Sequence, residues 1–237
     1  MSTTPATPVQ IPATLPMPKI EEDFYDWYAR HEAKARLAAA GNHDLIFIGD
    51  SITHLFEGDP QHPNRGEHLW RERYLRHNPL NLGFGYDRTQ NVLWRLEHGE
   101  FAAQTPKLVV ILIGTNNLST TGRFVANSPA QTAEGIQAVC AKVLAASPRS
   151  RILLMGVFPR STVESALRAQ VREINDLLKI FAEGHKSIDF LDIGPLFLDE
   201  AGSIPVSIMN DGVHPTAAGY RIWADAIESA ICGALVA

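Results

Sequence analysis

Three residue types that together can perform nucleophilic acyl transfer occur near the two ends of this chain. Ser51 follows the apolar run 45–48, and Asp211 and His214 share one short turn close to the C-terminus. A hydroxyl nucleophile, a base that takes its proton and an acid that orients the base are the parts of such a site. The spacing lets Asp211 reach the imidazole of His214, fix its tautomer and leave the other ring nitrogen for Ser51.

Each of these residues also has an ordinary structural explanation. Ser51 stands where a strand gives way to a helix, and an N-cap serine suits that position equally well. The Asn-Asp-Gly run at 210–212 favours a turn, in which a histidine can simply face solvent. The chain has nine histidines. The others lack such a partner pattern and are expected to be structural or solvated, among them His31, His54 and His98.

Two glycine-punctuated loops could donate hydrogen bonds to an oxyanion. Asn116 follows the apolar run 108–113 and Gly114, so its amide is expected at the edge of a sheet. One such donor is typically worth about 10²–10³ in rate. Gly83 and Gly85 permit a tight loop whose backbone N–H groups face a pocket. The alternatives are an asparagine bonded to its own backbone and a plain strand-to-helix turn.

Alternating apolar runs and amphipathic stretches predict the elements that would position these residues. Strands are expected at 45–48, 80–82, 108–113, 152–157 and 188–191, and helices at 21–40, 88–98, 130–146, 163–183 and 216–232. Runs that are apolar on both faces suit parallel strands covered by helices. The predicted fold is therefore α/β: a three-layer α/β/α sandwich, flavodoxin-like, with about five parallel strands. Ligands bind such sheets at the carboxyl ends of the strands, which Ser51, Tyr86 and Asn116 all follow.

Length and composition predict one domain and exclude several classes of protein. The 237 residues are 45% hydrophobic, and residues 1–20 read as a proline-rich tail, mobile or wrapped over a single domain at 21–237. The net charge of −5 is spread without basic runs, so nucleic acid is not an expected partner. No apolar stretch is long enough to span a membrane. No signal peptide is recognisable, which favours a cytoplasmic protein unless a leader precedes this sequence. Cys140 and Cys232 lie in helical patterns and are expected to be buried free thiols.

The joint order of these motifs resembles the SGNH (GDSL-type) hydrolase family, whose blocks carry Ser, Gly, Asn and His. Residues 49–52 (GDSI), 114–117 (GTNN) and 211–215 (DGVHP) are similar to three of those blocks, and 81–96 is similar to the catalytic subunits of platelet-activating-factor acetylhydrolase and their bacterial relatives. The resemblance implies Ser51 as nucleophile, His214 as base and Asp211 as its orienter. The oxyanion hole would combine the N–H groups of Ser51 and Tyr86 with the side chain of Asn116.

One position departs from the family pattern. Tyr86 stands where the second block carries glycine, so its ring would narrow or line the acyl site, and a positive φ there would strain it. Either Gly85 or Tyr86 could supply the backbone donor, and Tyr86 is preferred. Asp50, Gly85 and Asp87 are expected to support the pocket or its loops, Asp87 by capping the next helix or bracing its own loop.

The expected activity is hydrolysis of short, acetyl-like esters through an acyl-enzyme, with a small-molecule or glycan ester as substrate. A phospholipid-type acetylhydrolase or lysophospholipase and a glycan-binding protein without turnover are the alternatives. No cofactor or metal site is expected, because the histidines are scattered and no HExxH or paired Cys/His spacing occurs. The acetylhydrolase relatives dimerise, so the resemblance also allows a homodimer.

Overall fold

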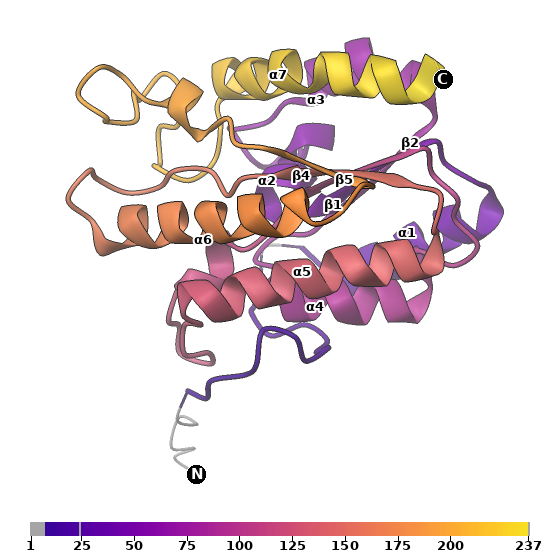
Figure 1. Cartoon of the computed structure of the whole chain (residues 1–237), viewed down its shortest axis with the longest axis horizontal. Coiled ribbons are helices and arrows are strands. Elements are labelled where there is room, and N and C mark those ends of the chain that lie inside the picture. The colour runs from indigo at the N-terminus through magenta and orange to yellow at the C-terminus, as the bar shows by residue number, and fades with distance from the viewer. Residues whose placement is uncertain (1–7, 24, 237) are drawn as a thin grey trace.

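A parallel five-stranded sheet forms the centre of the computed structural model, which describes residues 8–23 and 25–236 (Figure 1). The strands are β1 (Leu45–Gly49), β2 (Pro79–Gly83), β3 (Leu108–Leu112), β4 (Arg151–Met155) and β5 (Ile188–Leu191). Their spatial order, β2-β1-β3-β4-β5, is the flavodoxin-like order. The five predicted strands and the α/β class are confirmed.

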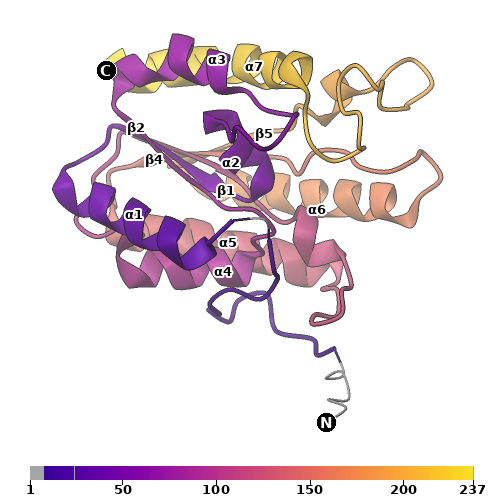
Figure 2. The same cartoon turned by 180° about the vertical axis from the view of Figure 1, so that it is seen from behind.

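Helices cover both faces of the sheet, as Figures 1 and 2 show from opposite sides. On one face lie α1 (Trp27–Ala40), α4 (Thr89–Arg95), α5 (Pro129–Ala146) and α6 (Ala166–Glu183), and on the other α2 (Ser51–Glu57), α3 (Glu67–Leu69) and α7 (Ala217–Val236). Short 3-10 or π-helical turns occur at Trp70–Tyr74, Leu75–His77, Leu96–Glu100, Thr115–Leu118 and Gly194–Phe197. Each face has its own apolar core, because side chains of one strand point alternately to the two faces.

Some local predictions need correction. The helix predicted from residue 21 begins at Trp27, where the side chain of Asp26 accepts a hydrogen bond from the Ala29 N–H and caps it. The stretch predicted as a helix at 88–98 ends in a π-helical turn that reaches Glu100. Cys140 is buried as predicted, but Cys232 is exposed, because it lies on the solvent side of α7.

The N-terminal segment, residues 8–23, lies against the body of the protein beside α4 and the loop after β3. Val9 forms a parallel bridge with Phe124. The carbonyls of Ile11 and Ala13 accept hydrogen bonds from Gln90 and Thr89. Of the two arrangements expected for the proline-rich tail, the described part has the wrapped one, and residues 1–7 lie outside the described residues.

Candidate active site

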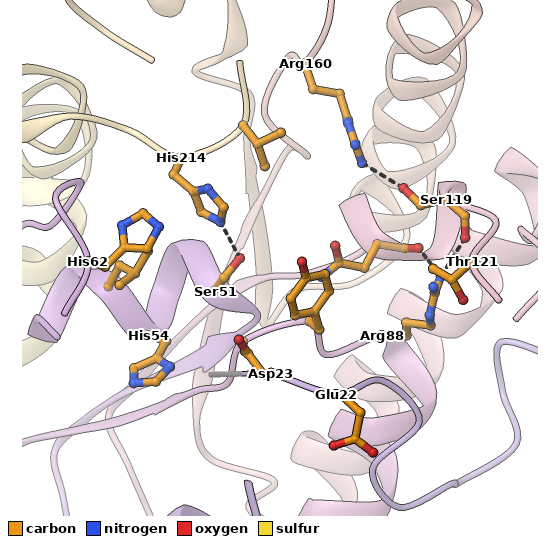
Figure 3. A pocket seen from close by; sticks show the side chains of 15 residues that line it. Glu22, Asp23, Ser51, His54, His62, Arg88, Ser119, Thr121, Arg160 and His214 are labelled. Carbon is orange, nitrogen blue, oxygen red and sulfur yellow. Dashed lines mark hydrogen bonds between the residues drawn. The ribbon is translucent and has the colours of Figure 1, made fainter. Parts of the chain in front are cut away.

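Ser51, His214 and Asp211 form a continuous chain of hydrogen bonds at the carboxyl edge of the sheet. Ser51 Oγ lies 2.9 Å from His214 Nε2 (Figure 3). His214 Nδ1 lies 2.7 Å from Asp211 Oδ2. Ser51 is the first residue of α2, directly after β1, whereas the other two residues precede α7. The fold thus brings into contact the three side chains that the sequence pattern assigned to one site.

The turn at 211–214 is held together by the same carboxylate that contacts the imidazole. Asp211 Oδ1 accepts hydrogen bonds from the N–H groups of Val213 and His214 at 2.9 and 2.7 Å. Partial burial raises the pKa of Asp211, but these bonds and the imidazole outweigh that effect and hold the pKa below its usual value. Asp211 therefore stays ionised and can stabilise an imidazolium.

Two further residues around His214 had no signal in the sequence. Asn64 is buried and donates to the carbonyl of His214 at 3.2 Å and to Asn210 Oδ1 at 2.6 Å. The ring of His62 meets the ring of His214 edge-on at 5.1 Å. Both come from the loop after α2, about 150 residues away in sequence, so only the folded chain brings them to this turn.

Asn116 and Tyr86 lie in the same cavity, in the loops that follow β3 and β2. Gly114, with φ of 126°, turns the chain out of β3 into the 3-10 turn that carries Asn116. The Asn116 amide donates one hydrogen bond to the Asp87 carbonyl at 2.9 Å. An amide nitrogen has two hydrogens, so a second donor remains.

Tyr86 adopts the left-handed backbone conformation that the sequence identified as a source of strain. Its φ is 58°, and its side chain is 53% exposed at the cavity. For an aromatic residue this conformation costs on the order of 1 kcal/mol. At Gly85 a Cβ would overlap the carboxylate of Asp23, so a larger residue there would displace that side chain.

A buried cluster of charged residues supports the loops after β2 and β3 that carry Tyr86 and Asn116. Asp87 accepts hydrogen bonds from Trp27 Nε1 at 2.7 Å and Arg95 Nε at 2.8 Å, and Arg95 also pairs with Glu100. Glu100 in turn contacts His31 at 2.7 Å. Of the two roles expected for Asp87, it braces the loop, since Arg88 occupies the cap position of α4.

Asp50 is also buried, next to the site rather than on its surface. Its carboxylate caps α2 by accepting a hydrogen bond from the Ile52 N–H at 3.0 Å. Burial raises the pKa of Asp50 to about 7. His54, on the same helix, lines the cavity, and burial together with the charges of Arg30 and Lys34 lowers its pKa to about 2, so its ring is neutral.

Arg88 ties the Asn116 loop to the N-terminal segment. Its Nη1 donates to the carbonyls of Asn116 and Ser119, its Nη2 pairs with Glu21 at 2.9 Å, and its guanidinium lies 3.7 Å from the centre of the Phe124 ring. Arg88 is 1% exposed. The backbone of Asn116 is therefore fixed by contacts from elements far apart in the sequence.

The cavity that these loops enclose has a volume of about 590 Å³ and a mixed lining. Polar and charged side chains from the N-terminal segment and from the loops after β3 and β4 face it, notably Glu22, Asp23, Ser119, Thr121 and Arg160 (Figure 3). The sequence analysis identified none of these five as pocket residues, since no motif marks them.

One group of potential metal ligands occurs among the described residues. Ligand atoms of His62, Asp211 and His214 lie within 4.8 Å of one another and could hold a divalent ion. In this structure His214 instead uses its ring nitrogens for Asp211 and Ser51. A metal ion there would compete with both hydrogen bonds.

A flavodoxin-like sheet that presents a serine, a histidine and an aspartate in hydrogen-bond contact at its carboxyl edge has the architecture of a serine hydrolase. The chain belongs to the GDSL-like lipase/acylhydrolase family, whose model matches residues 47–222. It is thus a carboxylic ester hydrolase, and the family resemblance seen in the sequence is confirmed.

One curated relative supports the family, and two solved structures share the fold. The human platelet-activating factor acetylhydrolase IB subunit alpha1 is 32% identical over 203 residues, which cover 86% of this chain and 81% of the relative. A GDSL-like lipase from Bacteroides thetaiotaomicron has a similar structure, with a TM-score of 0.69 and 21% identity over 88% of this chain and 100% of that one. An acetylxylan esterase from Geobacillus stearothermophilus gives a TM-score of 0.60 and 20% identity over 80% and 94% of the two chains.

No helix among the described residues is both long and apolar enough to cross a membrane.

Proposed function

We propose that this protein is a serine esterase that hydrolyses short, acetyl-like esters through an acyl-enzyme on Ser51. The observation that supports the proposal is the hydrogen-bonded chain from Ser51 Oγ through the imidazole of His214 to the carboxylate of Asp211. In this chain Nε2 is placed to accept the serine proton, while the carboxylate holds the tautomer that makes Nε2 an acceptor.

The reaction has two steps. Ser51 Oγ attacks the ester carbonyl carbon while its proton passes to Nε2 of His214. The tetrahedral intermediate then expels the alcohol, which takes that proton. A water molecule, deprotonated by His214, attacks the acyl-enzyme and releases the acid and the free Ser51 hydroxyl.

The negative charge that develops on the carbonyl oxygen requires fixed donors. We assign this role to the N–H groups of Ser51 and Tyr86 and to the second amide hydrogen of Asn116. Ser51 contributes from the first turn of α2, where N–H groups lack helical partners. The side-chain amide of Asn116 is oriented by its hydrogen bond to the Asp87 carbonyl. The backbone carbonyl of Asn116 is fixed by a hydrogen bond from Arg88.

The cavity favours a small acyl group on a polar alcohol. Tyr86 stands at the cavity with an exposed ring, and about half of the lining residues carry a charged or hydroxyl group, although most of the lining surface is apolar. A long acyl chain would have to desolvate these groups without forming hydrogen bonds to them, at a cost of about 1–3 kcal/mol for each group. Acetylated carbohydrate is one substrate class with the required polarity.

A phospholipid-type acetyl ester is the second candidate. It is supported by the 32% identity to platelet-activating factor acetylhydrolase subunits over most of both chains. An acetyl group on a glycerol backbone satisfies the same limit on acyl size, so the two candidates differ only in the alcohol half.

Hydrolysis of p-nitrophenyl acetate by the wild type and by Ser51→Ala tests the proposal. We expect turnover to fall by at least about 10³-fold in the variant while its circular dichroism spectrum is unchanged. Equal activity in both proteins would refute the role of Ser51. Rates on p-nitrophenyl esters from C2 to C12 should be highest at C2 to C4, and a maximum at C8 or longer would overturn the assignment of acyl size.

A further inference from the structure

Arg160 is a charged side chain in the cavity that the proposed reaction does not use. It follows β4 at the carboxyl edge of the sheet, and its backbone carbonyl accepts a hydrogen bond from Arg168 Nε at 3.3 Å. The side chain reaches across the cavity wall towards Ser119, on the far side of the cavity from His62 and His54 (Figure 3). Its Nη1 contacts the carbonyl of Thr115, the residue before Asn116.

The hydrogen-bond partners of Arg160 are all neutral. Nη1 donates to the Thr115 carbonyl at 2.9 Å and to the hydroxyls of Thr115 and Ser119 at 3.2 Å each. The buried Nε has no hydrogen-bond partner. Among the described residues Arg160 forms no ion pair, and Asp50 is the carboxylate whose field acts on it without contact. Nε and Nη2 thus have no acceptor from the described chain, and since Nε is buried, Nη2 is the nitrogen that a ligand in the cavity can reach.

Two other arginines beside the site, in contrast to Arg160, form ion pairs with carboxylates. Arg88 pairs with Glu21 at 2.9 Å, and Arg95 is enclosed between Asp87 and Glu100. Both of these charges are neutralised within the protein. Burial lowers the pKa of Arg160, and the field of Asp50 opposes this effect only in part. A guanidinium stays charged under these conditions, and an oxyanion from the ligand is the group that it lacks.

We propose that Arg160 is a specificity-determining residue that binds an anionic group, a carboxylate or a phosphate, on the alcohol half of the ester. This inference rests on the proposed function, because an acetyl group carries no charge and any anion must then lie on the alcohol. Nη2 carries two hydrogens, and a guanidinium N–H forms a charge-assisted hydrogen bond with an oxygen of a carboxylate or phosphate. Arg160 contacts Thr115, the residue before Asn116. An anion bound to Arg160 therefore lies close to the ester carbonyl of the substrate, whose oxygen faces the Asn116 amide.

The opposite wall of the cavity has the complementary charge. Glu22 and Asp23 reach the cavity from the N-terminal segment, and Glu22 pairs with Lys19 at 2.9 Å and with Arg123 at 3.0 Å. Arg160 thus differs from the charged groups on this wall, since Glu22 has two cationic partners and Arg160 has no anionic one among the described residues.

A pair of aryl acetates of matched shape tests the proposal. 4-Acetoxybenzoate and 4-acetoxybenzamide have similar leaving groups and differ in the charge on the alcohol half, and 4-acetoxyphenyl phosphate provides the phosphate case. We expect the wild type to prefer each anionic ester in kcat/KM by about 10- to 100-fold, the range for a charge-assisted hydrogen bond. Comparison of the two anionic esters shows which oxyanion fits better.

The quantity to compare between proteins is the ratio of kcat/KM for the anionic ester to that for the neutral one. Arg160→Gln should bring this ratio close to one, and Arg160→Lys should restore part of it. Arg149→Gln is the matched control, because Arg149 is exposed at the opposite, amino edge of β4. It removes the same charge and should leave the ratio unchanged. An equal loss on both esters in Arg160→Gln would mean that Arg160 only supports the Asn116 loop, and would overturn the proposal.

Binding separates this proposal from the proposed reaction. Titration calorimetry of 4-acetoxybenzoate into Ser51→Ala needs no turnover, and the affinity should fall about tenfold or more in Ser51→Ala/Arg160→Gln. If the wild type fails to hydrolyse any acetate but this difference in affinity holds, the esterase mechanism fails and the anion site stands. Equal affinities in the two variants would overturn the anion site whatever the enzyme hydrolyses.

Discussion

The two ends of the cavity are built in different ways. At one end, Asp211 and His214 belong to a single turn, and their side chains are 42% and 22% exposed. At the other end, Asn116 and Tyr86 rest on the buried group Asp87, Arg95 and Glu100. At the first end, Asp211 and His214 come from four consecutive residues of the sequence. The second end depends on contacts between segments that are distant in the sequence.

This difference determines how each end should respond to substitution. The Asp211 side chain is partly exposed and bonds to Val213 and His214 of its own turn, so its substitution should reduce the rate and leave the fold intact. The Asn116 end is continuous with the buried charges and with the N-terminal segment, so changes in residues far from the substrate should reach it. Removing one member of a buried ion pair leaves an uncompensated charge and typically costs about 3–5 kcal/mol.

The largest effect should come from the local end. Asp211→Asn keeps an oxygen for the N–H groups of Val213 and His214 but presents an amide where the imidazole needs an acceptor. We expect kcat for p-nitrophenyl acetate to fall by about 10³–10⁴, because the tautomer of His214 is no longer fixed. A loss of less than tenfold would show that the turn positions His214 without the carboxylate.

The stability of Asp211→Asn relative to the wild type should depend on pH. The pKa of Asp211 is lowered in the folded protein, so its ionised form stabilises the fold above its ordinary value of 3.8, and this contribution is lost as the pH falls through the lowered pKa. The difference in thermal midpoint between wild type and Asp211→Asn should therefore shrink below about pH 4. A difference that is constant from pH 3 to pH 8 would contradict the assigned direction.

The next largest effect should come from the donor at the other end. Asn116→Ala removes the amide hydrogen assigned to the oxyanion, and kcat should fall by about 10²–10³ with little change in KM. Asn116→Asp is of the same size but lacks the donor, and it should be at least as impaired. Activity within threefold of wild type in either variant would remove Asn116 from the oxyanion hole.

The smallest effect should reveal the remote support of this end. Glu21→Gln leaves Arg88 without its carboxylate partner, and Arg88 also holds the carbonyl of Asn116. We expect a loss of about tenfold in kcat, since slight displacement of a positioned donor is costly. Glu32→Gln is the control, because its pair with Arg36 is exposed and should contribute little. Similar rates in Glu21→Gln and Glu32→Gln would show that the Glu21–Arg88 pair does not support Asn116.

The local end could be predicted from the sequence because the information lies in adjacent residues. Asp211 and His214 are three residues apart, and Ser51 directly follows an apolar strand. The strands were placed within about two residues, since runs apolar on both faces leave few alternatives. The helix start at Trp27 was missed because the cap at Asp26 depends on one side-chain bond.

The other end was less accessible to sequence reasoning. Asn116 and Tyr86 could be placed at the sheet edge, but the partners that hold them could not. Glu21 meets Arg88 across 67 residues, and Trp27 meets Asp87 across 60. Arg160 follows the apolar strand β4 in a segment without a recognisable motif. It is distinguished by the absence of a carboxylate partner among the described residues. Such properties exist only once the chain is folded.

The wrapped N-terminal segment has a consequence for the order in which the chain becomes structured during synthesis. Residues 8–23 leave the ribosome before the sheet, yet the carbonyl of Ile11 bonds to Gln90 and Asn127, and Val9 bridges Phe124. The segment must wait until residue 127 has been translated before all of these partners exist. A segment made before the sheet is thus fixed only after most of its strands, and with it the acidic wall of the cavity.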